Sequence, residues 1–231
     1  MRVAGAPADS PARQVDAGEP ITVVAPDDDF VSRGGHKLAA ALDSFGVDVA
    51  GARVLDVGAS TGGFTDCMLQ RGAAHVDAID VGRAQLAWSL RNDPRVTVCE
   101  RTDVRDYARE PHDALPAVCT VDVSFVSLRT IAPALVACTT PTTTLVLLVK
   151  PQFEAGRARV GKGGIVRDPA VHRAVLREVV DGLEAAGIGV RALVASPLQG
   201  ADGNREFFAL ARHGEATVAD DAIDAVVGAA A

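Results

Sequence analysis

The sequence is short of aromatic residues, cysteines and basic residues, and each shortage excludes a class of protein. Aromatic side chains make up 4% of the 231 residues, which argues against extensive base-stacking platforms. Lys and Arg number 23 against 30 Asp and Glu, and the formal net charge of −7 excludes a strongly basic protein that coats nucleic acid. Hydrophobic residues reach 48%, so the chain is expected to fold as one domain, with at most a short appendage.

No signal for a metal site, a disulfide framework or a membrane span is present. The cysteines form no CxxC pair and are expected to be reduced and buried: Cys67, Cys99, Cys119 and Cys138. The uncharged stretch 131–149 contains Pro133 and Pro141, which fits helix, loop and strand better than a membrane helix. The N-terminus lacks the apolar core of a signal peptide, so a cytoplasmic protein is expected.

Short apolar stretches alternate with helical patterns along most of the chain. Apolar residues recur at helical spacing over 35–45, which places Lys37 near a helix start. Asp168 and Pro169 predict an N-cap and first position of a long helix. Strands are expected at 21–24, 53–57, 75–81, 96–99, 118–123, 144–149, 189–195 and 206–211, and other helices up to 69, at 85–90 and at 128–137. This alternation predicts an α/β fold with a doubly wound, Rossmann-like sheet.

A run of small residues, DVGASTGG at 56–63, joins an expected strand to a helix. Such a turn lets a ligand approach the backbone at a helix N-terminus, where negative charge is favoured. It lacks the spaced glycines of a dinucleotide fingerprint and the GK[ST] of a P-loop, so a carboxylate would serve as well as a pyrophosphate. Asp80 and Asp103 follow later strands and could accept from ribose hydroxyls and an adenine amino group. A nucleotide-like ligand with a carboxylate indicates S-adenosylmethionine (SAM); the alternative is a plain tight turn.

Four charged residues stand at or beside expected buried elements: Lys37, Asp122, Lys150 and Glu206. Charges in such places are rarely without a role. Two lysines and two carboxylates are together neutral, which allows a buried cluster. Taken singly, each has a simpler interpretation as a snorkelling lysine or a solvated carboxylate at a strand end.

Six stretches together resemble the TlyA (haemolysin A) family. They are VSRGGHKL at 31–38, LDVGASTGGFTD at 55–66, VDVSFVSL at 121–128, VKPQFE at 149–154, VGKGGIVRDPAVH at 160–172 and GNREFF at 203–208. Members are ribosomal RNA (rRNA) ribose 2′-O-methyltransferases with an FtsJ-like fold, in which the mostly parallel sheet has an antiparallel last strand. The resemblance implies a catalytic tetrad on Lys37, Asp122, Lys150 and Glu206. It implies SAM as cofactor, with binding residues expected at Asp56, Gly58, Ser60, Gly62, Gly63, Phe64, Asp80, Asp103 and Asp122.

The resemblance also implies a domain organisation. Full-length members begin with an S4-type RNA-binding domain, whereas residues 1–26 resemble only its last strands. We therefore expect an S4-like remnant at 1–26, a linker at 27–34, an FtsJ-like methyltransferase domain at 35–214 and a weakly helical tail at 215–231.

A mechanism follows as a hypothesis. A ribose 2′-hydroxyl is a poor nucleophile, so a base that removes its proton speeds attack on a sulfonium methyl group. We assign Lys150, in its neutral form, as that base. Lys37 and Glu206 are expected to position the substrate, and Asp122 to orient Lys150.

Basic residues are concentrated locally despite the acidic total. The segment 151–167 carries a net charge of +3 in a glycine-rich loop, and such loops can follow phosphates. RNA contacts are expected from Arg33, His36, Arg157, Arg159, Lys162 and Arg167. A solvated loop with no RNA role is the alternative.

Other functions stay open at this point. They are a non-catalytic RNA-binding or ribosome-assembly factor, a haemolysin-like membrane-acting protein and a SAM enzyme acting on a small molecule, since fold alone does not fix function. The expected partner is rRNA or a ribosomal subunit, with no membrane partner, and the expected state is a monomer.

Overall fold

The computed structural model describes residues 2–8, 13–22, 29–112, 114–216 and 218–229. Three short strands, β1 (Arg2–Val3), β2 (Ala6–Pro7) and β3 (Ile21–Thr22), pair antiparallel in the order β2-β1-β3. The expected strand at 21–24 is therefore seen for its first two residues, whereas Val23 and Val24 lie outside the described residues. So do parts of the expected S4-like remnant, linker and tail.

The second sheet has seven strands in the order β6-β5-β4-β7-β8-β10-β9. They are β4 (Arg53–Val57), β5 (His75–Asp80), β6 (Val96–Glu100), β7 (Val118–Val121), β8 (Thr144–Val149), β9 (Ile188–Ala195) and β10 (Phe207–His213). Strands β6, β5, β4, β7 and β8 pair in parallel, and β10 is antiparallel to both neighbours. The predicted mostly parallel sheet with an antiparallel last strand is confirmed.

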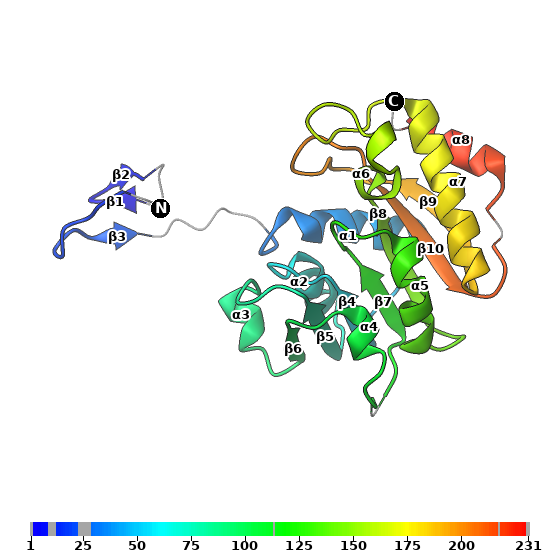
Figure 1. Cartoon of the computed structure of the whole chain (residues 1–231). Helices are drawn as coiled ribbons and strands as arrows, with labels where there is room; N and C mark the ends of the chain where they lie inside the picture. The colour runs from blue at the N-terminus through cyan, green and yellow to red at the C-terminus, as the bar shows by residue number, and fades with distance from the viewer. Residues whose placement is uncertain (1, 9–12, 23–28, 113, 217, 230–231) are drawn as a thin grey trace.

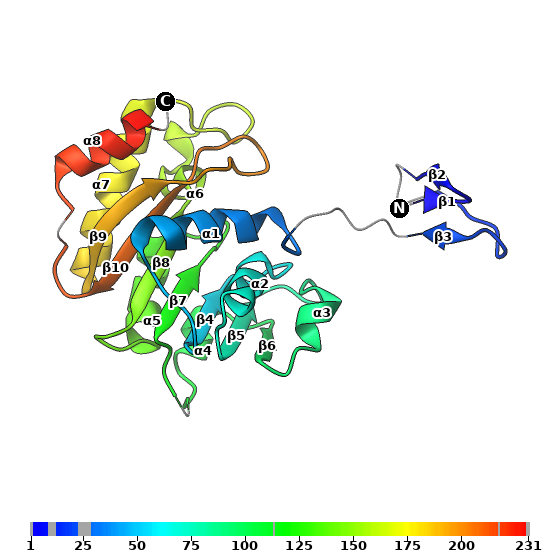
Figure 2. The ribbon, with the colours of Figure 1, turned by 180° about the vertical axis from the view of Figure 1, so that it is seen from behind.

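Helices cover both faces of this sheet, as Figures 1 and 2 show from opposite sides. They are α1 (Arg33–Phe45), α2 (Gly63–Gln70), α3 (Trp88–Arg91), α4 (Val104–Tyr107), α5 (Leu128–Ala137), α6 (Pro151–Glu154), α7 (Pro169–Ala185) and α8 (Asp220–Ala229), with a 3-10 turn at Arg157–Arg159. None of the helices in the described ranges combines the length and apolar character needed to cross a membrane.

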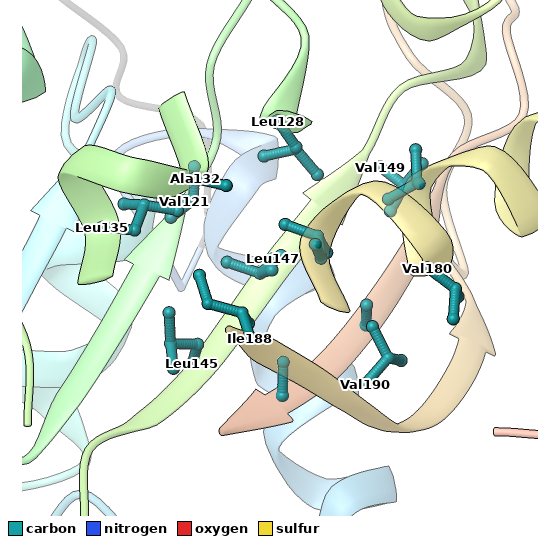
Figure 3. Close-up of a cluster of buried hydrophobic side chains, with 14 of the residues drawn as sticks. Val121, Leu128, Ala132, Leu135, Leu145, Leu147, Val149, Val180, Ile188 and Val190 are labelled. Carbon is teal, nitrogen blue, oxygen red and sulfur yellow. The ribbon is translucent and has the colours of Figure 1, made fainter. Parts of the chain in front are cut away.

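Buried side chains of the central strands point alternately to the two faces of the sheet, and each face has its own hydrophobic core. On β8, Leu145, Leu147 and Val149 face the core shared with α5 and α7, part of which Figure 3 shows. Val146 and Leu148 face the other core, which α1 and α2 cover. Because side chains of a strand point alternately to opposite faces, a strand buried on both sides is mostly apolar, as β8 is from Leu145 to Val149.

Several element ends differ from the sequence expectation. Strand β7 ends at Val121, so Asp122 follows the strand rather than lying within it. The helix expected at 85–90 begins only at Trp88, because Ala87 has a ψ of 142°, which is outside the helical range. The tail expected to be weakly helical contains α8, whose Ile223 is fully buried against the α7 side of the sheet.

The caps and cysteines agree with the sequence patterns. Asp168 accepts a hydrogen bond from the Ala170 amide at 2.9 Å, and Pro169 opens α7. All four cysteines are free thiols; Cys99 is half-buried and the others are buried.

Candidate active site

Two adjoining cavities lie at the carboxyl ends of the parallel strands. The sheet order reverses between β4 and β7, which is where such sheets place their ligands. The first, here called the aspartate cavity, has a volume of about 400 Å³ and is lined by Gly58, Asp80, Asp103 and Asp122 among others. The second, the lysine cavity, has a volume of about 500 Å³. Five residues line both: Gly58, Ser60, Asp122, Ser124 and Phe125.

The lysine cavity contains all four residues predicted as catalytic, and they form two ion pairs. The first joins Lys37, from the first turns of α1, to Glu206, the residue before β10, with Nζ 2.6 Å from Oε2. Only 8% of Lys37 and 4% of Glu206 is exposed. A buried charge is tolerated when it has such a partner.

The second ion pair joins the ends of two neighbouring strands. Lys150 follows β8 and Asp122 follows β7, and Nζ lies 2.5 Å from Oδ1. The same ammonium donates to Ser124 Oγ at 3.0 Å. The Asp122 amide donates to the Val57 carbonyl at 2.8 Å, which ties this strand end to the glycine turn after β4.

The glycine turn brings the backbone of β4 against that of β7. Gly58 has φ +86°, and a Cβ there would stand 2.4 Å from the Asp122 carbonyl oxygen, so only glycine fits. Gly62 has φ +99° and packs against Leu90, and it lines neither cavity. Gly63 and Phe64 line the lysine cavity.

Asp80 and Asp103 both line the aspartate cavity and are held by local donors. Asp80 accepts from the Ser60 amide at 2.8 Å and the Gly82 amide at 2.6 Å. Asp103 caps α4 and binds the Arg105 guanidinium, which lowers its pKa to about 2. Asp103 is therefore a fixed negative charge at neutral pH.

Strained backbone occurs in the loops that follow the parallel strands, and two of the strained residues, Ser60 and Phe125, line the aspartate cavity. Four non-glycine residues with positive φ follow successive parallel strands: Ser60 after β4, Ala84 after β5, Arg101 after β6 and Phe125 after β7. Such conformations cost about 1–3 kcal/mol each and cluster at functional sites.

Phe125 is the clearest site residue that the sequence analysis missed. Its side chain is 91% exposed at the boundary of the two cavities, and it packs on Phe153 with ring centroids 5.0 Å apart. Its position in VDVSFVSL, between a strand and a helix, was the available signal. Ser32, Ser124, Gln152 and Asp202 also line the lysine cavity without having been singled out.

Asp56 lies apart from both cavities. It is fully buried and accepts hydrogen bonds from Thr65 of α2 at 2.6 Å and Thr120 of β7 at 2.9 Å. Burial raises the pKa of Asp56 to about 6. The Asp56 carboxylate thus links β4 to α2 and β7, the elements next to the two cavities.

Replacing Asp56 by Asn is expected to stabilise the protein at neutral pH. Because the folded pKa is raised from an unfolded value of about 3.9, the folded state binds more protons between these values, so stability falls as pH rises from about 4 to about 6. The loss is on the order of 3 kcal/mol. An Asn side chain can hydrogen-bond both threonines without that loss.

Urea unfolding of Asp56→Asn at pH 5 and pH 7.5 measures this, with the exposed Asp181→Asn as control. A stability gain over the wild-type chain that is larger at pH 7.5 is expected. A gain that is equal at both pH values contradicts the assignment.

The residues predicted to contact RNA fall into three groups. Arg33 is exposed at the rim of the lysine cavity, and His36 packs on Phe30 with ring centroids 4.9 Å apart. Arg157, Lys162 and Arg167 are exposed on the loop between α6 and α7.

Arg159 differs from those three because it is engaged within the protein. Its guanidinium binds Glu178 of α7 at 2.6 and 2.8 Å and the Ala155 carbonyl at 2.7 Å. The loop itself is fastened by the buried Asn204, which binds the Val166 amide at 2.9 Å and the Gly164 carbonyl at 3.0 Å. Asn204 therefore ties this loop to the segment that precedes β10.

Comparison with known proteins gives matches over most of the chain. The family model described as FtsJ-like methyltransferase matches residues 30–213. The 16S/23S rRNA (cytidine-2′-O)-methyltransferase TlyA of Mycobacterium tuberculosis is 48% identical over 90% of this chain and 78% of its own length. Hemolysin A of Brachyspira hyodysenteriae is 43% identical over 78% of this chain and 75% of its own. The solved structure of a presumed hemolysin from Streptococcus thermophilus has a TM-score of 0.86 at 42% identity, covering 98% of this chain and 83% of that one.

Proposed function

The chain belongs to the FtsJ-like methyltransferases of the TlyA (haemolysin A) type, and on that premise we propose that it is a SAM-dependent rRNA methyltransferase. Its substrate is a ribose 2′-hydroxyl, of cytidine in 16S or 23S rRNA or both. One observation carries the proposal: four charged residues from four separate segments of the chain meet in one cavity beside the strand ends, and they are Lys37, Asp122, Lys150 and Glu206.

The aspartate cavity suits SAM. The carboxylates of Asp80 and Asp103 can accept from hydroxyl and amino groups, while Val104, Val126 and Ile131 offer apolar surface for a ring. When bound, SAM supplies an electrophilic methyl group. Asp122 and Ser124 stand on the boundary where the two cavities meet.

The residues of the lysine cavity supply base catalysis and positioning. In its neutral form, Lys150 takes the proton of the 2′-hydroxyl as the oxygen becomes nucleophilic. Asp122, 2.5 Å from Nζ, orients the lysine and stabilises the ammonium that results. Glu206 fixes Lys37, whose remaining N–H groups can donate to a substrate oxygen.

The lysine content of the chain supports this assignment. The sequence has only three lysines, Lys37, Lys150 and Lys162, among 23 basic residues. Two of the three line one cavity. Arginine stays protonated and cannot act as a base, whereas lysine can.

The exposed cations of the loop after α6 are expected to bind RNA phosphates. Replacing Arg157, Lys162 and Arg167 together by Ala should weaken rRNA binding and reduce the slope of log K against log salt by about 2–3, because each lost phosphate contact contributes about 0.7–0.9. Arg159→Ala is the comparison, since its guanidinium is bound to Glu178. Filter binding across a salt series measures both; an unchanged slope in the triple variant contradicts the assignment.

The function is tested by transfer of labelled methyl from SAM to 16S and 23S rRNA, naked and in ribosomal subunits. Reverse-transcription stops map the product, and alkali resistance identifies a ribose 2′-O-methyl group. Incorporation at a cytidine ribose is expected. Methylation of bases only, or of small molecules without RNA, would overturn the proposal.

A further inference from the structure

Two of the chain segments that line the lysine cavity run side by side. The β7 segment, residues 122–127, contains Asp122, Ser124 and Phe125, and the β8 segment, residues 150–154, contains Lys150 and Phe153. The Asp122–Lys150 ion pair joins their beginnings, at 2.5 Å. The Phe125–Phe153 ring contact joins them further along, with centroids 5.0 Å apart.

A buried carboxylate joins the ends of the same two segments. Glu154, 4% exposed, accepts from Ser127 Oγ at 2.5 Å and from the Leu128 amide at 2.7 Å. Leu128 is the first residue of α5, and its side chain lies in the same core as Val149 of β8 (Figure 3). Glu154 thus caps α5 and anchors both segments to rigid elements.

Arg129 also binds Glu154, through both its carbonyl and its carboxylate. Its Nη2 donates to the Glu154 carbonyl at 2.9 Å, and its Nε lies 3.4 Å from the Glu154 carboxylate. Its Nη1 lies 3.6 Å from Glu178 of α7, which also binds Arg159. Two carboxylates and two guanidinium groups make this network neutral, which allows Glu154 to be buried.

A glycine in α7 makes room for Arg129. At Gly182 a Cβ would stand 2.6 Å from Cγ and Cδ of Arg129. Glycine inside a helix costs about 1 kcal/mol relative to alanine. The close packing of the Arg129 side chain explains why this helix position has a glycine despite that cost.

We propose that Glu154 is a positioning residue for methyl transfer, which holds the β7 and β8 segments so that Asp122 and Lys150 meet in the lysine cavity. The inference rests on the proposed function. Glu154 lines neither cavity, so it acts through the residues that do. A displacement of about 1 Å at reacting groups can lower a rate about 100-fold. SAM binding is less sensitive to such a shift, because Asp80 and Asp103 line the aspartate cavity from other segments that Glu154 does not contact.

Glu154→Gln is the test variant, because it keeps the size of the side chain and can still accept from the Leu128 amide. Gly182→Ala is the second variant, since it displaces Arg129 and leaves Glu154 unchanged. Glu184→Gln is the matched control; that carboxylate accepts from the Ala216 amide at 2.9 Å, away from both cavities.

Each variant is compared with the wild-type chain for kcat, KM for rRNA, Kd for SAM and amide hydrogen exchange. We expect kcat to fall at least about tenfold in Glu154→Gln and in Gly182→Ala, with KM and Kd within about twofold. Exchange should accelerate in residues 122–128 and 150–155 and stay unchanged in β4 and β5. Glu184→Gln should match the wild-type chain.

Wild-type kcat in Glu154→Gln would overturn the proposal, as would a loss of SAM binding in step with kcat, which indicates general unfolding. Absence of methyl transfer by the wild-type chain would refute the proposed function instead. The positioning part is then decided by exchange alone: unchanged exchange in both segments refutes it, and selective acceleration supports it.

Discussion

Replacing Lys150 by Ala is expected to lower the rate of methyl transfer about 1000-fold, within the range for loss of a general base. Lys150→Arg should be nearly as inactive, because it keeps the positive charge but cannot accept a proton at neutral pH. Binding of SAM should change little in either variant, since Lys150 lines the lysine cavity and not the aspartate cavity. Single-turnover transfer and equilibrium binding of SAM measure the two effects separately.

The control for this experiment is Lys162→Ala, which removes the third lysine of the chain from an exposed loop. It should keep kcat and raise KM at most severalfold. Activity of Lys150→Arg near the wild-type rate would show that position 150 contributes charge rather than base catalysis. Lys37 would then be the remaining candidate for the base.

The fold was largely predictable from the sequence because its central strands are short, mostly apolar stretches that alternate with helical patterns. The expected strands at 53–57 and 144–149 coincide with β4 and β8, and the expected helix at 128–137 coincides with α5. Ends that depend on tertiary contacts were predicted less well. Asp122 follows β7 because its amide binds Val57 beside the glycine turn, a contact that no local pattern reveals.

The four charged residues of the lysine cavity were predictable, but their pairing was not. The tetrad residues were found from charge at buried elements and from the family resemblance, yet nothing in the sequence indicates that Lys37 pairs with Glu206 and Lys150 with Asp122. These pairs join residues far apart in the chain, so they depend on the sheet order and, for Lys37, on the packing of α1 against the sheet.

Asp56 illustrates what strand alternation could have added. Leu55 and Val57 face the core under α5, so the residue between them must face the opposite side, towards α2. That direction leads to Thr65 rather than to a cavity. The assignment of Asp56 to the cofactor therefore stays a prediction that the geometry does not favour.

Breaking the Lys37–Glu206 pair is expected to have the largest effect on stability. Lys37→Met leaves the Glu206 carboxylate buried without its cation, and removal of one partner of a buried pair costs about 3–5 kcal/mol. Urea unfolding measures the loss. The control is Arg109→Met, whose pair with Asp106 is 76% and 69% exposed; such pairs contribute at most about 1 kcal/mol.

The double variant Lys37→Met/Glu206→Leu separates stability from chemistry. Replacing both partners by apolar groups leaves no unpaired charge, so most of the lost stability should return. Methyl transfer should not return, because the ammonium that positions the substrate is absent. A double variant that regains both stability and activity would show that the pair serves only to hold α1 against β10, and the catalytic set would reduce to Asp122 and Lys150.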